Sequence, residues 1–495
     1  MKIVLVPLDD RPCNIYFPKI LPIKDNELVI TPKEIMGNIK TKADIPNLKK
    51  WIRNNIIDSD YLIIALDTLI YGGLIPSRLH HDKLEELIFN LEFIKGIKNI
   101  NPNLKIYGYI TIMRTPNSYF NSEEPDYYNK YGKEIFKLGV LLNKELLNII
   151  NEQEKEELKY LKGYIPIDII NDYIDRRNIN LEVTKKAYEL YLDKYFDYFY
   201  IPQDDSSPYG FTRIDQLKLK DFISEDIAIF PGADEVGLVL LSRAILDKEN
   251  KKIKIFVRFT SSTGETVIPS FEDRMIDITI SNQIMTSGGV RVYSLLESDA
   301  VMVINIGSSM AVFPKEFDRI IPYDINRNLS EIIEYIKYSK SLGKLVGVAD
   351  VAIPTGADIE LIKLLDKENL LLSIDSYAGW NTASNTIGTV LSNLGILYVT
   401  HDYKQNKHFL IHRYYDDVGY CSKVRTETDL FALSHGYSEA VLDGRDGMIT
   451  KYARKTLIEY MNKEFKSISR YLKDIKVTSP WNRTFEMQFD IIINM

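Results

Sequence analysis

Short apolar segments alternate with amphipathic segments of helix length along most of the chain. The apolar segments are rich in Val, Ile, Leu and Tyr at consecutive positions, not only at alternate ones. This pattern is typical of strands that are buried on both faces of a parallel sheet. It predicts strands at Lys2–Leu8, Glu27–Ile30, Tyr61–Leu66, Lys105–Thr111, Phe196–Pro202, Ile227–Phe230, Lys254–Phe259, Val301–Ile306, Leu345–Ala349 and Leu370–Ile374.

Helical segments lie between many of these strands, as at Lys83–Lys95 and Val236–Leu246. Strands that alternate with helices are the mark of βαβ units and of a parallel sheet. The pattern therefore predicts an α/β fold of mainly parallel sheets, in two Rossmann-like or flavodoxin-like halves with a site in the crevice at the carboxyl ends of the strands. A single TIM-like (β/α) barrel is the alternative.

The alternation of strands and helices changes twice along the chain, and these changes predict the domain boundaries. We expect an N-terminal α/β domain at 1–250 with a helical insertion at 123–192, and a flavodoxin-like domain at 251–400. Residues 401–495 form a C-terminal α+β segment that is mostly helical. In it we expect helices at Arg425–Ala440 and Thr450–Leu472 and a closing strand at Phe485–Ile493.

Composition narrows the class of protein. The chain has 495 residues, which is too long for one ordinary core, and its net charge is 62 − 69 = −7. A mildly acidic chain has no overall attraction for nucleic acid or for an anionic membrane, so neither is an expected partner. Two cysteines without paired spacing, a short N-terminal apolar run and no long apolar stretch predict a cytoplasmic protein. The oligomeric state stays open.

Polar side chains follow the ends of at least six predicted strands, where both architectures place ligands. Helix capping accounts for a single Asp or Asn at such a place, but not for paired acids together with arginines. The residues are Asp9, Asp10 and Arg11; Asp67, Tyr71 and Arg78; Arg114; Asp204 and Asp205; Asp234 and Glu235; Asp350 and Asp358; and Asp375, Trp380, Asn381 and Asn385.

Paired carboxylates are the sharpest signal for catalysis. Asp204-Asp205 and Asp234-Glu235 each follow a predicted strand. Two neighbouring acids repel when both are ionised, so the pKa of one rises and that acid can donate a proton near neutral pH. The alternative for Asp234-Glu235 is a structural one, because carboxylates also stabilise the start of a helix.

Arg11, Arg78 and Arg114 suggest that the substrate is anionic, since guanidinium groups grip carboxylates and phosphates with two hydrogen bonds. The alternative is that they neutralise nearby protein acids, namely Asp9, Asp10 and Asp67. Those three acids and Tyr71 are also candidates for binding substrate.

Trp380 is one of three tryptophans and stands in a loop beside Asn381. A tryptophan face stacks on a sugar ring, and Asn381 and Asn385 are suited to bind its hydroxyls. The alternative is that Trp380 anchors the core.

Evidence for cofactors is weaker. The six histidines form no HExxH motif, and His408 and His412 fall in a segment that we interpret as a strand. We expect no cofactor; the alternative is Mg²⁺ or Mn²⁺ held by Asp9, Asp67 and Asp350, because hard cations take oxygen ligands. The polar loop Ser261–Glu265 is a further candidate for binding substrate.

Several motifs taken in order resemble one family. They are Pro7-Leu8-Asp9-Asp10-Arg11-Pro12, then Asp67 with Tyr71-Gly72-Gly73-Leu74 and Ser77-Arg78, Asp204-Asp205, Gly232-Ala233-Asp234-Glu235, Tyr377-Ala378-Gly379-Trp380-Asn381-Thr382 and Pro480–Glu486. Together they resemble an uncharacterised bacterial family catalogued as domain of unknown function 4127. The resemblance covers essentially the whole chain and implies a bacterial protein of one architecture. It brings no established catalytic residues.

The leading hypothesis is a hydrolase that acts on a carbohydrate, a glycosidase with Asp205 as general acid and Asp204 or Glu235 as its partner. Its substrate would be an acidic or N-acetylated sugar. The first alternative is a lyase, hydrolase or phosphoryl-processing enzyme that depends on Mg²⁺ or Mn²⁺. The second is a protein that binds a small ligand without turning it over.

Overall fold

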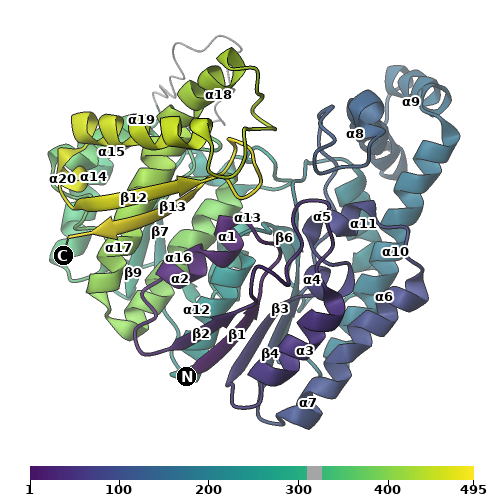
Figure 1. Cartoon of the computed structure of the whole chain (residues 1–495), viewed down its shortest axis with the longest axis horizontal. Coiled ribbons are helices and arrows are strands. Elements are labelled where there is room, and N and C mark those ends of the chain that lie inside the picture. Colours follow the sequence, from purple (N-terminus) through teal and green to yellow (C-terminus); the bar gives the residue numbers. More distant parts are fainter. Residues whose placement is uncertain (309–325, 495) are drawn as a thin grey trace. The chain divides into compact units, whose positions relative to one another are not determined.

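Residues 1–308 and 326–494 are described by the structure, a computed structural model (Figure 1). The chain divides into two units, each built around its own parallel sheet. The first unit comprises Met1–Asp10, Asn26–Gly237 and Phe271–Arg274, and the second comprises Arg11–Asp25, Leu238–Ser270 and the chain from Met275 onward. The boundaries predicted after residues 250 and 400 stay predictions.

The first unit contains an open sheet of six strands in the order β2-β1-β3-β4-β5-β6, and every neighbouring pair is parallel. The order reverses at β1 and β3, which makes their carboxyl ends the switch point of the sheet. The strands are β1 (Lys2–Val6), β2 (Glu27–Ile30), β3 (Tyr61–Ala65), β4 (Lys105–Tyr109), β5 (Tyr198–Gln203) and β6 (Ile229–Pro231).

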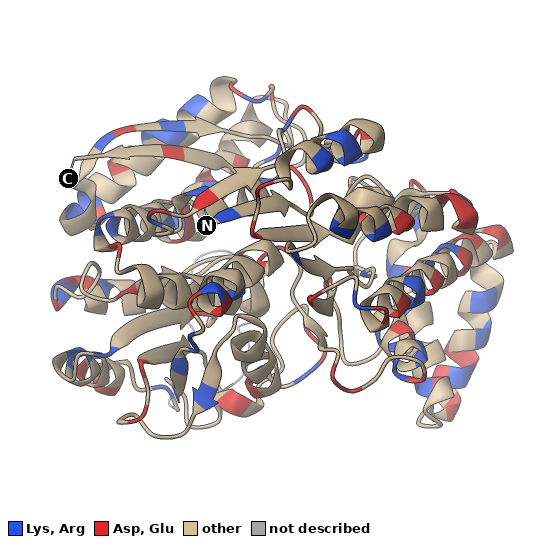
Figure 2. Ribbon diagram, turned by 90° about the horizontal axis from the view of Figure 1, so that it is seen from below, with Lys and Arg blue, Asp and Glu red and all other residues tan. Residues whose placement is uncertain are grey.

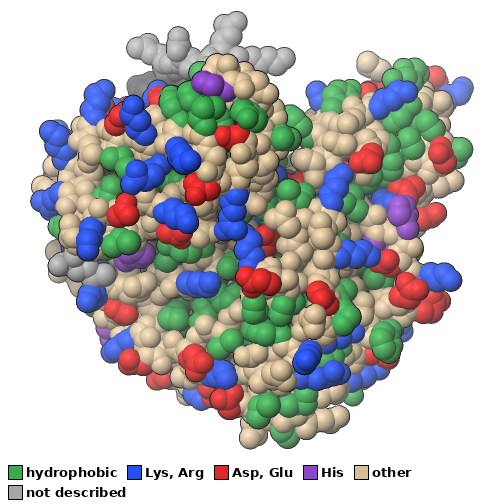
Figure 3. All heavy atoms as spheres, viewed as in Figure 1, with side chains coloured by type: hydrophobic (Ala, Val, Ile, Leu, Met, Phe, Trp, Pro, Cys, Tyr) green, Lys and Arg blue, Asp and Glu red, His purple; other side chains and the backbone are tan. Residues whose placement is uncertain are grey.

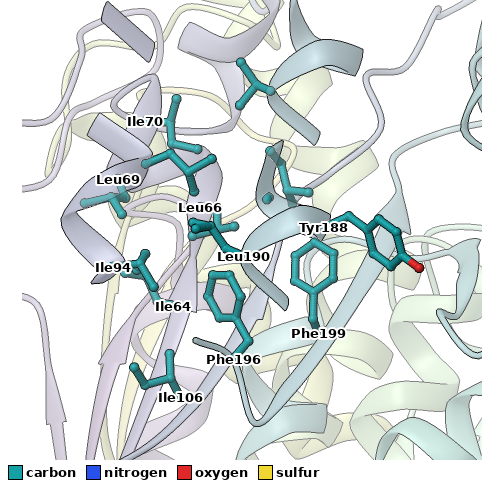
Figure 4. Close-up of a cluster of buried hydrophobic side chains, with 14 of the residues drawn as sticks. Ile64, Leu66, Leu69, Ile70, Ile94, Ile106, Tyr188, Leu190, Phe196 and Phe199 are labelled. Atoms are coloured by element: carbon teal, nitrogen blue, oxygen red, sulfur yellow. The ribbon is translucent and has the colours of Figure 1, made fainter. Parts of the chain in front are cut away.

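Burial on both faces explains why these strands read as continuous apolar runs. All five residues of β3 are buried. On one face, Ile64 and Ile106 lie in a hydrophobic cluster with Phe196 and Phe199, shown in Figure 4. Neither side of β3 therefore needs polar side chains.

The helices of the first unit include a long helical segment between β4 and β5. They are α3 (Ile45–Asn55), α4 (Leu66–Ile70), α5 (Leu74–Leu79), α6 (Leu84–Leu91), the 3₁₀ helix η1 (Glu92–Gly96), α7 (Ile97–Ile100), α8 (Tyr128–Leu146), α9 (Glu152–Tyr164), α10 (Ile167–Leu192) and α11 (Phe211–Lys220). Tyr128, Leu138, Tyr173 and Phe211 belong to a separate small core that α8, α10 and α11 share. Charges of both signs line the outer sides of these helices (Figure 2).

The second unit contains an open parallel sheet in the order β11-β10-β9-β7-β8. Numbered from its own first strand, this is the order 2-1-3-4-5, which also describes the first five strands of the other sheet. The strands are β7 (Lys254–Phe259), β8 (Val290–Val292), β9 (Ala300–Asn305), β10 (Leu345–Asp350) and β11 (Ser376–Ala378). The flavodoxin-like halves are thereby confirmed, and the alternative of a closed TIM-like barrel was wrong because both sheets are open.

The remaining elements belong to the second unit, apart from α12 (Val236–Lys248), which begins in the first unit. A small antiparallel sheet of β12 (Leu472–Thr478) and β13 (Gln488–Ile493) lies near the C-terminus. The helices are α1 (Pro12–Ile15), α2 (Phe17–Ile20), the 3₁₀ helix η2 (Gly264–Thr266), α13 (Ile276–Thr286), α14 (Leu329–Ser341), α15 (Ile359–Lys367), α16 (Ala383–Thr400), α17 (Tyr403–Arg413), the π-helix η3 (Tyr414–Val424), α18 (Arg425–Ser434), α19 (Met448–Glu464) and α20 (Lys466–Ser469).

The strand predicted at Leu370–Ile374 was wrong. Leu370, Leu371 and Ile374 are buried in turns, and the strand that pairs with β10 is β11, which begins only at Ser376. Asp375 therefore lies at the amino end of the strand, not at its carboxyl end. Its carboxylate accepts hydrogen bonds from Val346 N at 2.7 Å and from Lys340 Nζ at 2.6 Å, which is a structural role.

Two predictions about the C-terminal segment also need correction. His408 and His412 lie on helix α17, not on a strand, and the Asp402 side chain caps this helix by accepting from Gln405 N. The helix predicted to reach Ala440 ends at Ser434, and Leu472, predicted as helical, begins β12. The apolar spacing at Phe409, Leu410 and Ile411 fits either structure, so periodicity alone did not decide between them.

No described helix combines the length and the apolar character that crossing a bilayer requires. On the face of the molecule that Figure 3 shows, lysines and arginines are interspersed with acids, so neither sign of charge dominates that face.

Candidate functional site

Six charged side chains meet at the carboxyl edge of the first sheet, and we call them the acid–arginine cluster. They come from three different strand exits. Arg78 lies on α5 beyond β3, and Arg114 follows β4, as do the two acids that precede α8. The last two acids directly follow β5. The cluster consists of Arg78, Arg114, Glu123, Glu124, Asp204 and Asp205.

Each arginine of the cluster bridges several acids. Arg78 donates to Glu123 at 3.1 Å and to Glu124 at 3.2 Å, and it also pairs with Asp204. Arg114 donates to Glu124 at 2.7 Å, to Glu123 at 2.9 Å and to Asp205 at 3.1 Å. Sequence reasoning predicted that Arg78 and Arg114 would neutralise Asp9, Asp10 and Asp67 if they did not bind substrate. They pair with other acids instead.

A tight turn brings Arg78 to the cluster. Gly72 and Gly73 join α4 to α5 with φ values of 90° and 138°, which L side chains rarely adopt. A Cβ atom on Gly72 would also lie 2.8 Å from Lys42 Cβ. The turn therefore requires glycine at Gly72, and it starts α5 so that Arg78 on its last turn is buried among the acids.

The exit of β5 is held by a second segment of the chain. Gln203 Nε2 donates to Asp273 Oδ2 at 3.0 Å, and Arg274 donates to Gln203 Oε1 at 2.7 Å. Ser206 N donates to Phe271 O at 2.8 Å. These contacts flank Asp204 and Asp205 on both sides, so the backbone that carries the acid pair is fixed.

The helical segment fixes Arg114 in a similar way. Arg177 on α10 is buried and donates to Met113 O at 2.6 Å and to Arg114 O at 2.9 Å, while Asp215 on α11 accepts from Arg177 Nε at 2.7 Å. Tyr173 OH donates to Arg114 O at 3.1 Å. The backbone carbonyls beside Arg114 are thus satisfied by α10, and its guanidinium is aimed at the acids. Sequence reasoning did not find these residues, because no strand exit marks them.

The pKa values of the two adjacent aspartates are shifted in opposite directions. Burial raises the pKa of Asp205 to about 6, and the charge of Asp204 adds to the rise. Burial acts on Asp204 in the same direction, but Arg78 and Arg114 outweigh it and hold the pKa of Asp204 below its usual value. The side chain of Asp205 is 28% exposed, against 10% for Asp204. The pair therefore contains an ionised, enclosed carboxylate beside a carboxyl that is accessible and easily protonated.

A second group of acids lies beside the cluster, around the buried side chain of Tyr109. Asp67, Asp9 and the pair Asp234-Glu235 all raise the pKa of Tyr109, after the larger effect of burial. Asp67 Oδ2 accepts from Thr111 N at 3.0 Å, whereas Asp67 Oδ1 is buried without a hydrogen-bond partner among the described residues. Burial raises the pKa of Asp67 to about 7.

Replacing Asp67 with Asn is expected to flatten the pH dependence of stability. A carboxyl whose pKa is higher in the folded state stabilises the fold fully below its unfolded pKa, near 4, and loses that contribution as the pH rises to about 7. The change is up to about 4 kcal/mol, since one pKa unit corresponds to about 1.4 kcal/mol. Urea unfolding of wild type and Asp67→Asn from pH 4 to 8 measures it.

The matched control for this experiment is Asp126→Asn, because the side chain of Asp126 is 92% exposed. It should keep the wild-type pH dependence. A wild-type slope retained in Asp67→Asn would show that Asp67 is ionised throughout this range.

Asp10, which also follows β1, has its carboxylate bound by other residues of the first unit. Asp10 accepts from Asn38 Nδ2 at 3.1 Å and pairs with Lys33 at 3.2 Å.

Tyr71 is buried, and its ring lies 5.0 Å from that of His80. Arg11 belongs to the second unit, where its guanidinium lies 5.0 Å from the centroid of the Trp481 ring.

The second unit has its own buried polar group at the carboxyl ends of β9 and β10. Asn305 donates to Asp350 at 2.8 Å and to Asp358 at 3.1 Å, and Tyr377 OH donates to Asp350 at 3.1 Å. Arg327 pairs with Asp358. Burial, and then the charge of Asp358, raise the pKa of Asp350 to about 7. Asp350 is therefore tied into a local network.

The three acids proposed as an alternative metal site do not all belong to the same unit. Asp9 and Asp67 belong to the first unit and Asp350 to the second. Within residues 1–308 and 326–494, no group of three or more His, Cys, Asp or Glu side chains is arranged to hold a metal ion.

Trp380 is anchored by its own unit. Its indole N–H donates to Thr389 Oγ1 at 3.1 Å, and its ring meets the edge of Phe17 at 5.3 Å. Asn385 completes a capping box with Thr382 at the start of α16, and it accepts from Asn381 at 2.7 Å. These contacts are those of a helix start and a core-facing tryptophan.

A further acid pair escaped sequence reasoning. Asp416 and Asp417 lie on the π-helix η3, where both pair with the buried Arg413. Asp417 also accepts from Gly379 N at 2.8 Å, which fixes the loop that carries Trp380. The doubled acid was a usable signal, as it was for Glu123-Glu124, but it did not follow a predicted strand.

These observations define an α/β protein of two flavodoxin-like units with an acid–arginine cluster at the carboxyl edge of its first sheet. The chain belongs to the family described as Protein of unknown function (DUF4127), whose model matches residues 3–490. The resemblance seen in the sequence is thereby confirmed. No curated protein matches the sequence.

Proposed function

We propose that the chain is a glycoside hydrolase in which Asp205 is the general acid. The observation that carries the proposal is the adjacent pair of carboxyls in the acid–arginine cluster, one held ionised and the other raised to a pKa of about 6 and partly exposed. Glycoside hydrolysis needs one carboxylic acid that protonates the leaving oxygen and one carboxylate that acts at the other side of the reaction.

The reaction begins when protonated Asp205 donates its proton to the glycosidic oxygen, and the bond from that oxygen to the anomeric carbon breaks. In an N-acetylated sugar the acetamide oxygen attacks the anomeric carbon as the leaving group departs. Ionised Asp204 accepts a hydrogen bond from the acetamide N–H and so stabilises the positive charge that develops there. Water then opens the ring intermediate and returns its proton to Asp205.

The cluster favours a neutral sugar over an acidic one. Arg78 and Arg114 already bridge four carboxylates, and those acids leave the cluster with a negative net charge when ionised. An anionic substrate would have to displace these ion pairs. Of the two substrate classes expected from the sequence, we therefore propose the N-acetylated one.

The experiment is an assay of the purified full chain on aryl glycosides of neutral, N-acetylated and uronic sugars. Wild type, Asp204→Asn and Asp205→Asn are compared on each compound. Turnover of the N-acetylated compounds that both substitutions reduce is expected. Turnover that neither substitution changes would contradict the assignment.

A further inference from the structure

The two sheets have the same strand order, but the loop after the first strand carries different side chains in each sheet. After β1, the first strand of the first sheet, the chain continues as Pro7-Leu8-Asp9-Asp10. After β7, the first strand of the second sheet, it continues as Thr260-Ser261-Ser262-Thr263-Gly264-Glu265-Thr266. In sheets of this order, ligands bind beyond the carboxyl ends at the switch point, which here is the exit of β7 and β9. The loop after the first strand therefore carries acids in the first sheet and hydroxyl groups in the second.

The beginning of this hydroxyl loop, Thr260–Thr266, is fixed to the exit of β9. Thr260 Oγ1 donates to Ile306 O at 2.9 Å, and Thr260 Oγ1 accepts from Ile306 N at 3.0 Å. A Cβ atom on Gly264 would lie 2.6 Å from Ile306 Cγ2, so the loop approaches β9 as closely as glycine allows. The loop is consequently held in place at the exit of β9, and Ser262 N at its tip also donates to Asn326 O at 3.4 Å.

The tip of the loop is open. Ser262 and Thr263 are exposed, in contrast to the buried Thr260 and Ser261 on the strand side. Serine and threonine hydroxyls donate hydrogen bonds to anionic oxygens, as they do to the phosphates of DNA. Two adjacent donors at the end of a fixed loop can thus contact one tetrahedral group.

An arginine with a largely enclosed side chain lies next to the strand side of the loop. Arg327 forms an isolated antiparallel bridge with Ser261, and its guanidinium donates to Asn305 Oδ1 at 3.2 Å. Its pairing with Asp358 holds the side chain in place, with only 7% of it exposed. Arg327 is therefore held at the exit of β9, the other strand of the switch point, as one half of an ion pair with Asp358.

We propose that the hydroxyl loop binds the phosphate group of a phosphate monoester. Ser262 and Thr263 donate hydrogen bonds to the phosphate oxygens. The ligand class includes flavin mononucleotide and sugar phosphates, which share this group. This loop belongs to the second unit and the acid–arginine cluster to the first, and the proposal does not depend on the glycosidase assignment.

The test measures binding to the full chain by calorimetry. The probes are inorganic phosphate, ribose 5-phosphate and flavin mononucleotide, with ribose and riboflavin as their counterparts without phosphate. We expect a phosphate-bearing probe to bind more tightly than its counterpart. The double substitution Ser262→Ala, Thr263→Ala should weaken that binding at least tenfold, since hydrogen bonds to charged groups contribute more than neutral ones.

Two further variants make the result specific. Ser341→Ala removes a hydroxyl at the end of α14, which precedes β10 and so lies at the amino edge of the same sheet, and it should leave binding unchanged. Glu265→Gln removes a negative charge from the loop itself and should strengthen the binding of phosphate-bearing probes severalfold.

The two sources of phosphate are separated by the probes. Tight binding of flavin mononucleotide without ribose 5-phosphate identifies a flavin phosphate, and binding of both identifies a subsite for the phosphate alone. Absence of binding by all three phosphate probes overturns the proposal. So does binding that the double substitution leaves at the wild-type level while circular dichroism shows an intact fold.

Discussion

Asp205→Asn is expected to lower kcat on an unactivated glycoside by about 10²- to 10⁴-fold, the usual contribution of a general acid. The amide is close in size to the carboxyl but cannot protonate the leaving oxygen. The loss should be smaller for aryl glycosides whose leaving groups are good, because these need little protonation. Asp193→Asn, at an exposed position after α10, is the matched control and should keep wild-type activity.

The pH profile of the wild type provides a second check on Asp205. Its carboxyl must be protonated to act, so activity should fall as the pH rises through about 6. This limb should disappear in Asp205→Asn, whose residual activity no longer depends on that proton. An equal loss for good and poor leaving groups would show that Asp205 acts by holding the structure and not by donating a proton.

The two sheets were predictable because their strands are buried on both faces. A strand such as β3, with five buried residues, leaves an apolar run that no surface helix produces. The short edge strands were less visible. β8 has three residues with Arg291 at its centre, and β11 begins with a buried serine, so neither forms an apolar run. In both cases strand pairing, and not composition, decides the structure.

The acid–arginine cluster was predictable in part. Arg78, Arg114, Asp204 and Asp205 stand where parallel strands end, and the topology brings such positions together. Glu123 and Glu124 were missed because they reach the cluster from the loop that precedes α8, nine and ten residues beyond Arg114 along the chain. Arg177 holds the backbone beside Arg114 by donating to the carbonyls of Met113 and Arg114, and no sequence pattern predicts that contact.

The second unit shows the limit of the same rule. Asp350, Trp380 and Asn385 also lie at strand exits, yet their side chains are engaged in a buried network, a core contact and a helix cap. A strand exit predicts where polar residues gather. Whether they face a ligand depends on partners such as Asn305 and Tyr377, which come from other strands and are not predictable from local sequence.

Arg78→Met is expected to lower the free energy of unfolding by about 3–5 kcal/mol, the range for breaking a buried ion pair by removing one partner. Only 1% of the Arg78 side chain and 1% of the Glu124 side chain are exposed, so solvent cannot replace the lost guanidinium. Arg53→Met, at an exposed position on α3, is the matched control, and it should cost less than about 1 kcal/mol.

The expected cost of Arg78→Met depends on pH, and this separates electrostatics from packing. Without Arg78, Glu124 and Asp204 retain only Arg114, so their pKa values should rise and their protonated forms should be favoured in the folded state. The variant should therefore be closest to wild type near pH 4 and fall further behind it as the pH rises to 7. Adding Glu124→Gln to Arg78→Met removes one of the stranded charges and should recover part of the stability at pH 7. Equal losses at both pH values, with no recovery in the double variant, would mean that Arg78 stabilises the first unit through the packing of its side chain and not through its charge.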